Sequence, residues 1–337
     1  MKTCLLVSIC LLSYLLSRTQ QVTVLTSGQQ TSLRGLSVVS NKIAWASGSN
    51  GTVARTTDGG NTWSWIHPEG YEQRDFRDIE GFDDKTAVVM AIAEPAILLK
   101  TTDAGRHWKK VYENTTPGMF LDAMTFWNRE SGMVIGDPVN GKFFIARTYN
   151  NGETWENTSP GKLPAADSGE ACFASSGSNI AALNLAEAGF ISGGTRARFF
   201  YKGRPVTLPL QQGNSSSGAN SLAARDPKKR KNKGVMVVVG GDFAHDTVSS
   251  RTCALSADGG KTWTLPEAGP HGYRSCVIYL DKHTLFSCGT SGTDWSTDGG
   301  QHWQQTGTEG FHVCAKAKHG NAVFLAGNGK IASFSRK

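Results

Sequence analysis

Short apolar runs alternate along the chain with turn-forming residues, and this pattern predicts β-strands rather than helices. The clearest group contains four such runs, at residues 76–82 (FRDIEGF), 86–93 (TAVVMAIA), 97–101 (ILLKT) and 108–112 (WKKVY). Each run is shorter than an ordinary helix, and the residues between the runs are typical of tight turns. We therefore predict an all-β protein whose strands come in groups of four.

One turn motif recurs five times, each time between the third and fourth runs of a group. Its pattern is Ser/Thr-x-Asp-x-Gly-x-x-Trp, with Asn once in place of Asp, and successive copies are 45, 47, 108 and 40 residues apart. The Asp or Asn side chain fixes the turn by accepting backbone hydrogen bonds, the Gly takes a positive φ, and the Trp opens the next strand. The spacing of 108 residues corresponds to two repeats. The turn residues, which we interpret as structural, are Asp58, Asp103, Asn150, Asp258 and Asp298.

Seven groups of strands can be counted, but the last one lacks a fourth strand. It consists of residues 311–317, 321–327 and 330–335, whereas residues 22–25 (VTVL) form a strand without a partner before the first group. A linear array of hairpins would leave both outer edges unpaired. We therefore predict a seven-bladed β-propeller of four-stranded blades, closed by the N-terminal strand.

The net charge of +7 on 337 residues is concentrated in two segments. The first 20 residues carry Lys2 and Arg18 without an acid, and residues 225–233 (RDPKKRKNK) carry six bases and one acid, so the rest of the chain is neutral. Proteins that bind nucleic acid spread basic charge over a folded face. We therefore expect no nucleic-acid partner and interpret residues 225–233 as a basic loop insertion.

The N-terminus has the pattern of a secretory signal peptide over residues 1–19. Lys2 precedes an apolar run at residues 4–16 that is too short to span a bilayer comfortably. The cleavage site lacks Ala-x-Ala, so an uncleaved anchor is the alternative. We predict an exported protein, periplasmic or secreted, in which residues 20–337 form a single propeller domain. We expect a monomer with no membrane span after signal cleavage.

The first strands of a propeller line its central channel, so we align their early positions to find a binding site. In this alignment the fourth group begins with residues 170–176 as its first strand and continues with residues 180–186. Three of the aligned residues are Arg, which recognises anions and carboxylates through paired N–H donors. The alternative is a solvated lining with internal ion pairs, such as Arg77 with Asp78 or Glu170. The aligned positions are Arg34, Arg77, Leu121, Glu170, Asn220, Arg274 and His312.

Loops on the same predicted face add acidic residues, so the chain has a second functional interpretation. Paired carboxylates about 5–10 Å apart support glycoside hydrolysis. A carbohydrate-active hydrolase, sialidase-like or another glycosidase, is therefore the alternative function, with a glycan as ligand. No motif for nicotinamide, flavin or metal is present, so we expect no cofactor and lean against an enzyme. The loop residues are Glu94, Asp137, Asp242, His245, Asp246 and Asp294.

Five cysteines follow the signal segment, namely Cys172, Cys253, Cys276, Cys288 and Cys314. The odd number leaves at least one thiol unpaired within the chain. Cys276 and Cys288 flank a predicted hairpin, and a three-residue turn at residues 281–283 would place them directly opposite each other. Two alternatives stay open for this pair, a disulfide or two small buried side chains.

The recurring turn is that of the Asp-box, or BNR, repeat. With residues 33–39 (LRGLSVV) and 45–63 (WASGSNGTVARTTDGGNTW), it makes the chain resemble the photosystem II stability/assembly factor family over essentially the whole mature length. The chain is also similar to exported BNR-repeat proteins of non-photosynthetic bacteria, which are often labelled oxidoreductase. The resemblance implies a propeller that engages a partner protein through an arginine-rich patch, for which Arg34, Arg77 and Arg274 are the candidates here.

These observations favour a non-catalytic exported scaffold that recognises a protein or peptide through a polar, Arg-containing channel mouth. Sialidases also carry Asp boxes and hold a carboxylate with three Arg. The start of this chain, Leu33-Arg34-Gly35-Leu36, departs from their Phe-Arg-Ile-Pro motif.

Overall fold

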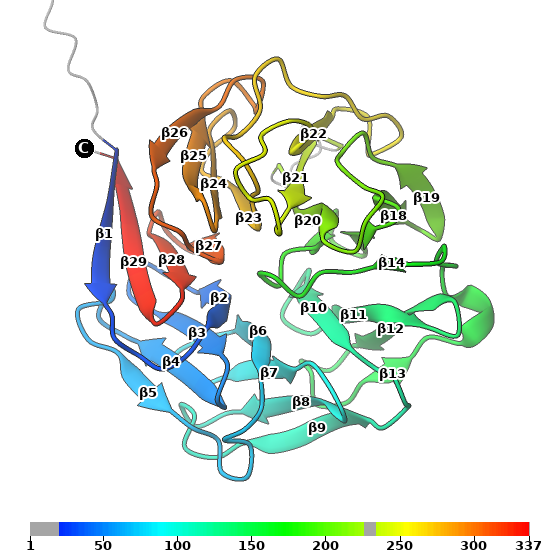
Figure 1. Cartoon of the computed structure of the whole chain (residues 1–337). Helices are drawn as coiled ribbons and strands as arrows, with labels where there is room; N and C mark the ends of the chain where they lie inside the picture. The colour runs from blue at the N-terminus through cyan, green and yellow to red at the C-terminus, as the bar shows by residue number, and fades with distance from the viewer. Residues whose placement is uncertain (1–19, 226–233, 337) are drawn as a thin grey trace, which may run out of the picture.

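The computed structural model describes residues 20–225 and 234–336, which form seven sheets arranged in a ring around a central axis (Figure 1). The protein is therefore a seven-bladed β-propeller, as the sequence predicts. The predicted signal peptide and residues 226–233 of the basic insertion lie outside the described residues. Within those residues, no helix has the length and apolar character needed to span a bilayer.

Each of the first three blades is an antiparallel sheet whose strands follow chain order from the channel to the rim (Figure 1). The bounds of blade one are β2 (Leu33–Val38), β3 (Ala44–Gly48), β4 (Thr52–Thr56) and β5 (Ser64–Ile66). Those of blade two are β6 (Phe76–Gly81), β7 (Ala87–Ala91), β8 (Ala96–Thr101) and β9 (Lys109–Asn114). Those of blade three are β10 (Leu121–Phe126), β11 (Gly132–Val139), β12 (Lys142–Thr148) and β13 (Glu156–Asn157).

Blades four to six follow the same plan after a single 3-10 turn, η1 (Pro160–Lys162). The bounds of blade four are β15 (Ile180–Ala182), β16 (Ala188–Ile191), β18 (Arg198–Tyr201) and β19 (Arg204–Thr207). Those of blade five are β20 (Ser217–Ala224), β21 (Met236–Asp242) and β22 (Cys253–Ser256), with an outer bridge between Leu255 and Thr264. Those of blade six are β23 (Cys276–Tyr279), β24 (Leu285–Gly289), β25 (Gly292–Ser296) and β26 (Gln304–Gly307).

Blade four corrects one sequence prediction. Its inner strand is β15, so residues 170–176 are not the first strand of this blade. Instead β14 (Glu170–Ala171) pairs with β17 (Gly193–Gly194), which in turn joins the inner edge of β20. Glycine permits this close approach, because a Cβ on Gly218 would lie 2.3 Å from the Cα of Gly193.

The last blade combines the two ends of the described chain, which confirms the predicted closure. It contains β27 (Val313–Lys316), β28 (Val323–Gly327) and β29 (Lys330–Arg336), with β1 (Gln20–Thr26) added at the rim. β1 runs antiparallel to β29, and Val22 faces Phe334. Closure removes the unpaired edge that a linear array would expose.

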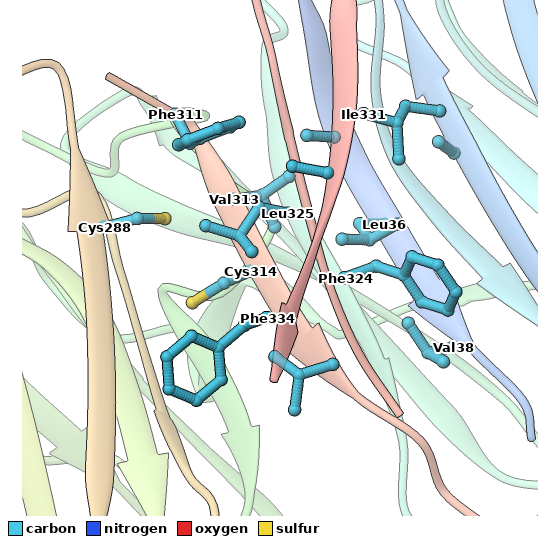
Figure 2. Packing of buried hydrophobic residues seen from close by; sticks show 14 of the residues in the cluster. Leu36, Val38, Cys288, Phe311, Val313, Cys314, Phe324, Leu325, Ile331 and Phe334 are labelled. Carbon is cyan, nitrogen blue, oxygen red and sulfur yellow. The ribbon is translucent and has the colours of Figure 1, made fainter. Parts of the chain in front are cut away.

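The hydrophobic core lies between neighbouring blades. Figure 2 shows part of the cluster that blades six, seven and one share, in which Leu36 and Val38 of β2 pack near Phe324 and Ile331 of blade seven. Trp63, the last residue of the first Asp box, packs edge-on against Phe324 with ring centroids 6.0 Å apart. The repeated Trp therefore contributes to packing between blades.

The Asp boxes close their own turns, and the first copy shows how. Thr56 Oγ1 donates a hydrogen bond to Asp58 Oδ1 (2.9 Å), and the backbone N–H of Thr62 donates to the same oxygen (2.9 Å). The N–H of Gly59 donates to the carbonyl of Lys42 in the β2–β3 turn (3.0 Å). The boxes therefore lie on the face that carries the turns between first and second strands, and the first strands begin at the opposite face.

This hydrogen bonding predicts a specific acid sensitivity. Hydrogen bonds from the side chain and backbone of Thr62 lower the pKa of Asp58 to about 2, and the carboxylate is exposed. A carboxyl group whose pKa is lower in the folded state stabilises the fold above its unfolded pKa of about 3.9, and this stabilisation is lost as the pH falls towards 2. Asp58→Asn keeps an acceptor oxygen, as Asn150 does naturally, and removes the titration.

We therefore expect the free energy of unfolding of the Asp58→Asn variant to fall less steeply than that of the wild type between about pH 4 and pH 2. Urea unfolding at both pH values measures this difference. Glu69→Gln, in an exposed loop outside the boxes, is the matched control. Parallel losses in all three proteins would contradict the prediction.

Candidate functional site

Four inner strands begin with a β-bulge at the face opposite the Asp boxes. The pairing register shifts between Leu33 and Gly35, between Phe76 and Asp78, between Leu121 and Ala123, and between Ala219 and Ser221. A bulge re-aims the side chain of its extra residue. The bulged residues are Arg34, Arg77, Asp122 and Asn220.

The sequence alignment of these positions is therefore wrong by one residue in blade three. Leu121 pairs in register with Gly136, so Asp122 is the equivalent of Arg34. The missed signal is the apolar residue just before each bulge, which is Leu33 in blade one and Leu121 in blade three. Aligning on that apolar residue would have selected Asp122.

A segment of residues 172–178, which we call the central segment, crosses the middle of the ring. Figure 1 shows the chain after β14 reaching inwards between blades three and five. Ser175 Oγ donates to Asn220 Oδ1 (2.8 Å) and Ser176 Oγ donates to the carbonyl of Ser275 (2.6 Å). Gly177 has a positive φ of 65°, and a Cβ there would lie 2.5 Å from the Asp78 carboxyl carbon. The central segment therefore fills part of the central channel.

Arg34 and Arg77 lie side by side against the central segment. Arg34 Nη1 donates to the carbonyl of Ser175 (3.3 Å), and Arg77 Nη1 donates to that of Ala174 (3.2 Å). Arg77 also pairs with Asp75 at 2.7 Å. Arg34 has no carboxylate partner among the described residues, and burial together with the Arg77 charge lowers its pKa.

His312 lies next to the two arginines and is neutral at pH 7. Its pKa is lowered to about 4, first by burial and then by the positive charge of Arg34. Its Nδ1 lies 3.1 Å from the carbonyl oxygen of Leu33. The positive charge at this end of the channel therefore comes from Arg34 and Arg77.

Arg274, the third arginine of the predicted ring, is completely buried inside blade six. Its guanidinium forms an ion pair with Asp294, which is also completely buried. It donates further hydrogen bonds to the carbonyl of Tyr273 (2.7 Å) and to Ser291 Oγ (2.9 Å). Its donors are occupied within the protein, so we leave Arg274 out of the candidate site.

Two other predicted ring residues also bind internal partners. Glu170 lies on β14, where its carboxylate pairs with Arg198 and accepts a hydrogen bond from Ser192. Asn220 is buried and receives hydrogen bonds from Ser175 and from the hydroxyl of Tyr273 (2.9 Å). The predicted ion pairs of Arg77 with Asp78 or Glu170 are not formed, because Arg77 pairs with Asp75.

The sequence predicted that the remaining acidic residues lie in loops, but Asp137 is on β11, Asp242 ends β21 and Asp294 is on β25. Glu94 accepts a hydrogen bond from the N–H of Gly118 (2.7 Å). Asp242 accepts one from Ser216 Oγ (2.6 Å) and lies 3.0 Å from Nδ1 of His245. Burial alone would raise the pKa of Asp242, but these hydrogen bonds outweigh it and lower the pKa to about 2. Asp246 accepts from Thr290, whereas Asp294 accepts from the N–H of His271 and pairs with Arg274.

Asp137, one of the predicted site residues, lies near Asp122, the residue that the structure substitutes for Leu121 in the alignment. Asp122 is completely buried, and the backbone N–H groups of Ala174 and Asp137 together with the charge of Arg77 only partly offset the effect of burial on the pKa of its carboxyl group. Burial, followed by the charge of Asp137, raises its pKa well above the usual range. Burial also raises the pKa of Asp137 to about 6, although the N–H of Cys172 donates to it at 2.8 Å.

A cavity of about 840 Å³ lies on the Asp-box side of the central segment. Its wall includes Asp78, whose pKa is raised to about 8 by burial although two backbone N–H groups donate to it. The sequence did not single out this cavity, because the central segment that closes one end of it is distant in sequence from the inner strands. Cys276 and Cys314 also line it.

All five cysteines of the described chain are buried and free. The predicted register is confirmed, because Cys276 pairs directly with Cys288. Of the two alternatives for Cys276 and Cys288, the structure shows two small buried side chains and no disulfide. Within residues 20–225 and 234–336, no three His, Cys, Asp or Glu side chains are arranged to hold a metal ion.

Comparison with known protein families shows which family the chain belongs to. The sequence model of the photosynthesis system II assembly factor YCF48 matches residues 17–316. The chain belongs to the YCF48 family. This confirms the resemblance inferred from the boxes. The curated proteins contain no match to the chain.

Solved structures similar to this YCF48-family chain include two of YCF48 itself. One, described as YCF48 bound to D1 peptide, has a TM-score of 0.62 and 16% identity, covering 96% of each chain. YCF48 from Cyanidioschyzon merolae has a TM-score of 0.60 and 16% identity, covering 94% of this chain and 98% of that one. At such identities the likeness shows the fold alone.

A glycoside hydrolase also shares the propeller fold. The GH74 enzyme of Niastella koreensis has a TM-score of 0.57 and 12% identity, and the match covers 83% of this chain but 47% of the enzyme. The YCF48-family chain therefore spans about half of that enzyme, and the similarity is one of architecture.

Proposed function

We propose that this YCF48-family propeller is a non-catalytic scaffold that binds a protein or peptide carrying a carboxylate at the Arg34–Arg77 face. The observation that carries the proposal is that Arg34 has no carboxylate partner in the described chain, although it lies beside the guanidinium of Arg77. A partly buried guanidinium of this kind favours a ligand that supplies the missing negative charge. The YCF48 structure with a D1 peptide supports a peptide as the ligand.

An exposed aromatic residue gives the proposed site an apolar side. Phe243 is 49% exposed, and its ring packs edge-on against Phe173 of the central segment (5.7 Å) and against Tyr273 (6.2 Å). Exposed aromatic rings on a rigid support are typical contacts for peptide side chains. We propose that the ligand places a carboxylate at Arg34 and an apolar side chain on Phe243.

The remaining parts of the proposal concern the setting of the scaffold. We propose that residues 1–19 direct export and are removed, and that the mature protein acts as a monomer in the periplasm or outside the cell. N-terminal sequencing of the protein recovered from the source cells tests the cleavage. The signal-peptide pattern supports this view. We do not propose a hydrolase, because Glu170 and Asp242 are already bound to Arg198, Ser216 and His245.

A peptide library tests the proposed ligand chemistry. Random peptides with free C-terminal carboxylates are bound to the immobilised protein, and the enriched sequences are resynthesised with a free carboxylate and with a C-terminal amide. We expect amidation to weaken binding about 10- to 150-fold, because a hydrogen bond to a charged group contributes about 1.5–3 kcal/mol. Equal affinities of the two forms would contradict recognition of a terminal carboxylate.

A further inference from the structure

Three of the five buried cysteines meet where blade six packs against blade seven. Cys276 on β23 pairs directly with Cys288 on β24, and its thiol donates to the carbonyl of Cys314 on β27 (3.2 Å). The three side chains belong to one core cluster. Figure 2 shows the side chains of Cys288 and Cys314 on their two facing strands.

We propose that Cys276, Cys288 and Cys314 form a redox-active thiol cluster in which Cys276 makes one disulfide, with either Cys288 or Cys314. The two thiols that join lose two protons and two electrons, and these reduce an external disulfide such as glutathione disulfide to two thiols. The third cysteine keeps its thiol. As a thiolate it can attack the new disulfide, so that the bond exchanges between the two partners of Cys276.

The backbone geometry suits such a bond. Residues directly opposite each other in an antiparallel pair have Cα atoms about 4.5–5.5 Å apart, within the range of about 4.4–6.8 Å that disulfides span. Cys276 and Cys288 have this relationship. Contacts between β23 and β27 bring Cys314 to the same place from the next blade. A bond from Cys276 to Cys314 would link blade six covalently to blade seven.

The chemistry of the thiols supports Cys276 as the shared member. Hydrogen bonds from the thiols of Cys288 and then Cys314 lower the pKa of Cys276 well below its usual value. Burial raises the pKa values of Cys288 and Cys314. Cys276 and Cys314 also line the cavity of about 840 Å³. The thiolate is the reactive form, so the first attack starts from Cys276.

Refolding the full chain under defined redox conditions tests the proposal. The chain is unfolded and reduced, refolded in buffer with reduced and oxidised glutathione, alkylated after denaturation, and digested for mass spectrometry. Refolding removes the barrier that burial places before the oxidant. We expect cross-linked peptides that contain Cys276 joined to Cys288 or to Cys314. Cys288→Ser is expected to keep a bond from Cys276 to Cys314, and Cys314→Ser a bond from Cys276 to Cys288.

The matched control is Cys253→Ser, which removes a buried thiol of blade five and should leave the cross-linked peptides unchanged. Cys276→Ser is expected to abolish the disulfide. A wild-type chain that refolds with no Cys276 cross-link under oxidising glutathione would overturn the proposal. So would a bond between Cys288 and Cys314 that forms in Cys276→Ser at the wild-type yield. The wild-type peptide map is decisive even if a variant does not fold.

Discussion

Reversing both charges at the proposed site, Arg34→Glu with Arg77→Glu, is expected to weaken binding of a carboxylate-terminated peptide by about 100-fold or more. Each arginine that loses a charged hydrogen bond to the ligand removes about 1.5–3 kcal/mol, and the new glutamates repel the ligand carboxylate. Isothermal titration calorimetry with the enriched peptide measures the change. The binding should also weaken in the wild type as salt increases, because the site is partly open to solvent.

The matched control is Arg106→Glu with Arg129→Glu, which changes the net charge equally on the Asp-box face. Arg106 lies in the second box, and Arg129 pairs with Asp83 in the turns of that face. This variant is expected to bind like the wild type. Equal weakening by the two double variants would show that overall charge, rather than the Arg34–Arg77 face, attracts the peptide.

A conservative replacement separates charge from geometry. Arg34→Lys with Arg77→Lys keeps both positive charges but removes the planar pair of donors that binds a carboxylate through two parallel hydrogen bonds. Its affinity is expected to lie between those of the wild type and the double Glu variant. An affinity equal to that of the wild type would mean that the site recognises charge alone.

The second large effect is expected on stability. Arg274→Met is expected to lower the free energy of unfolding by about 3–5 kcal/mol, because it leaves the carboxylate of Asp294 buried without its charged partner. Both side chains of the pair are completely inaccessible to solvent. Urea unfolding measures the loss, and the fraction that remains folded should bind the peptide with unchanged affinity.

Replacing both members of the pair provides the control. Arg274→Met combined with Asp294→Asn leaves no unpaired buried charge, so part of the lost stability should return. An Arg274→Met variant with normal stability and no peptide binding would restore Arg274 to the binding site. That outcome would support the arginine ring as the sequence first suggested it.

The repeat architecture was readable from the sequence because its causes are local. Each box contains the acceptor, the glycine and the tryptophan that make its turn, so Thr56, Asp58 and Trp63 predict a turn between two strands without knowledge of any distant residue. The count of strands then required the segment at Val22 to complete the last blade. Closure followed from the cost of unpaired strand edges.

The sequence placed Arg34 and Arg77 together because both occupy the same position in neighbouring repeats. It failed at Leu121 because a bulge moves the register by one residue, and an alignment by spacing alone does not show which residue is bulged. It failed at Glu170 because the fourth repeat is interrupted by a segment that pairs with blade five through glycines.

The sequence by itself determined the number of blades, the box turns and the end of the channel at which the inner strands begin. Only the tertiary structure decided which arginine carries an unused charge, because Arg274, just before β23, meets Asp294 on β25, whereas Arg34 meets a backbone carbonyl. It also brought Cys314 to Cys276 from another blade. Local turn chemistry fixes the repeats, whereas charge pairing and burial depend on contacts between residues that are far apart in the chain.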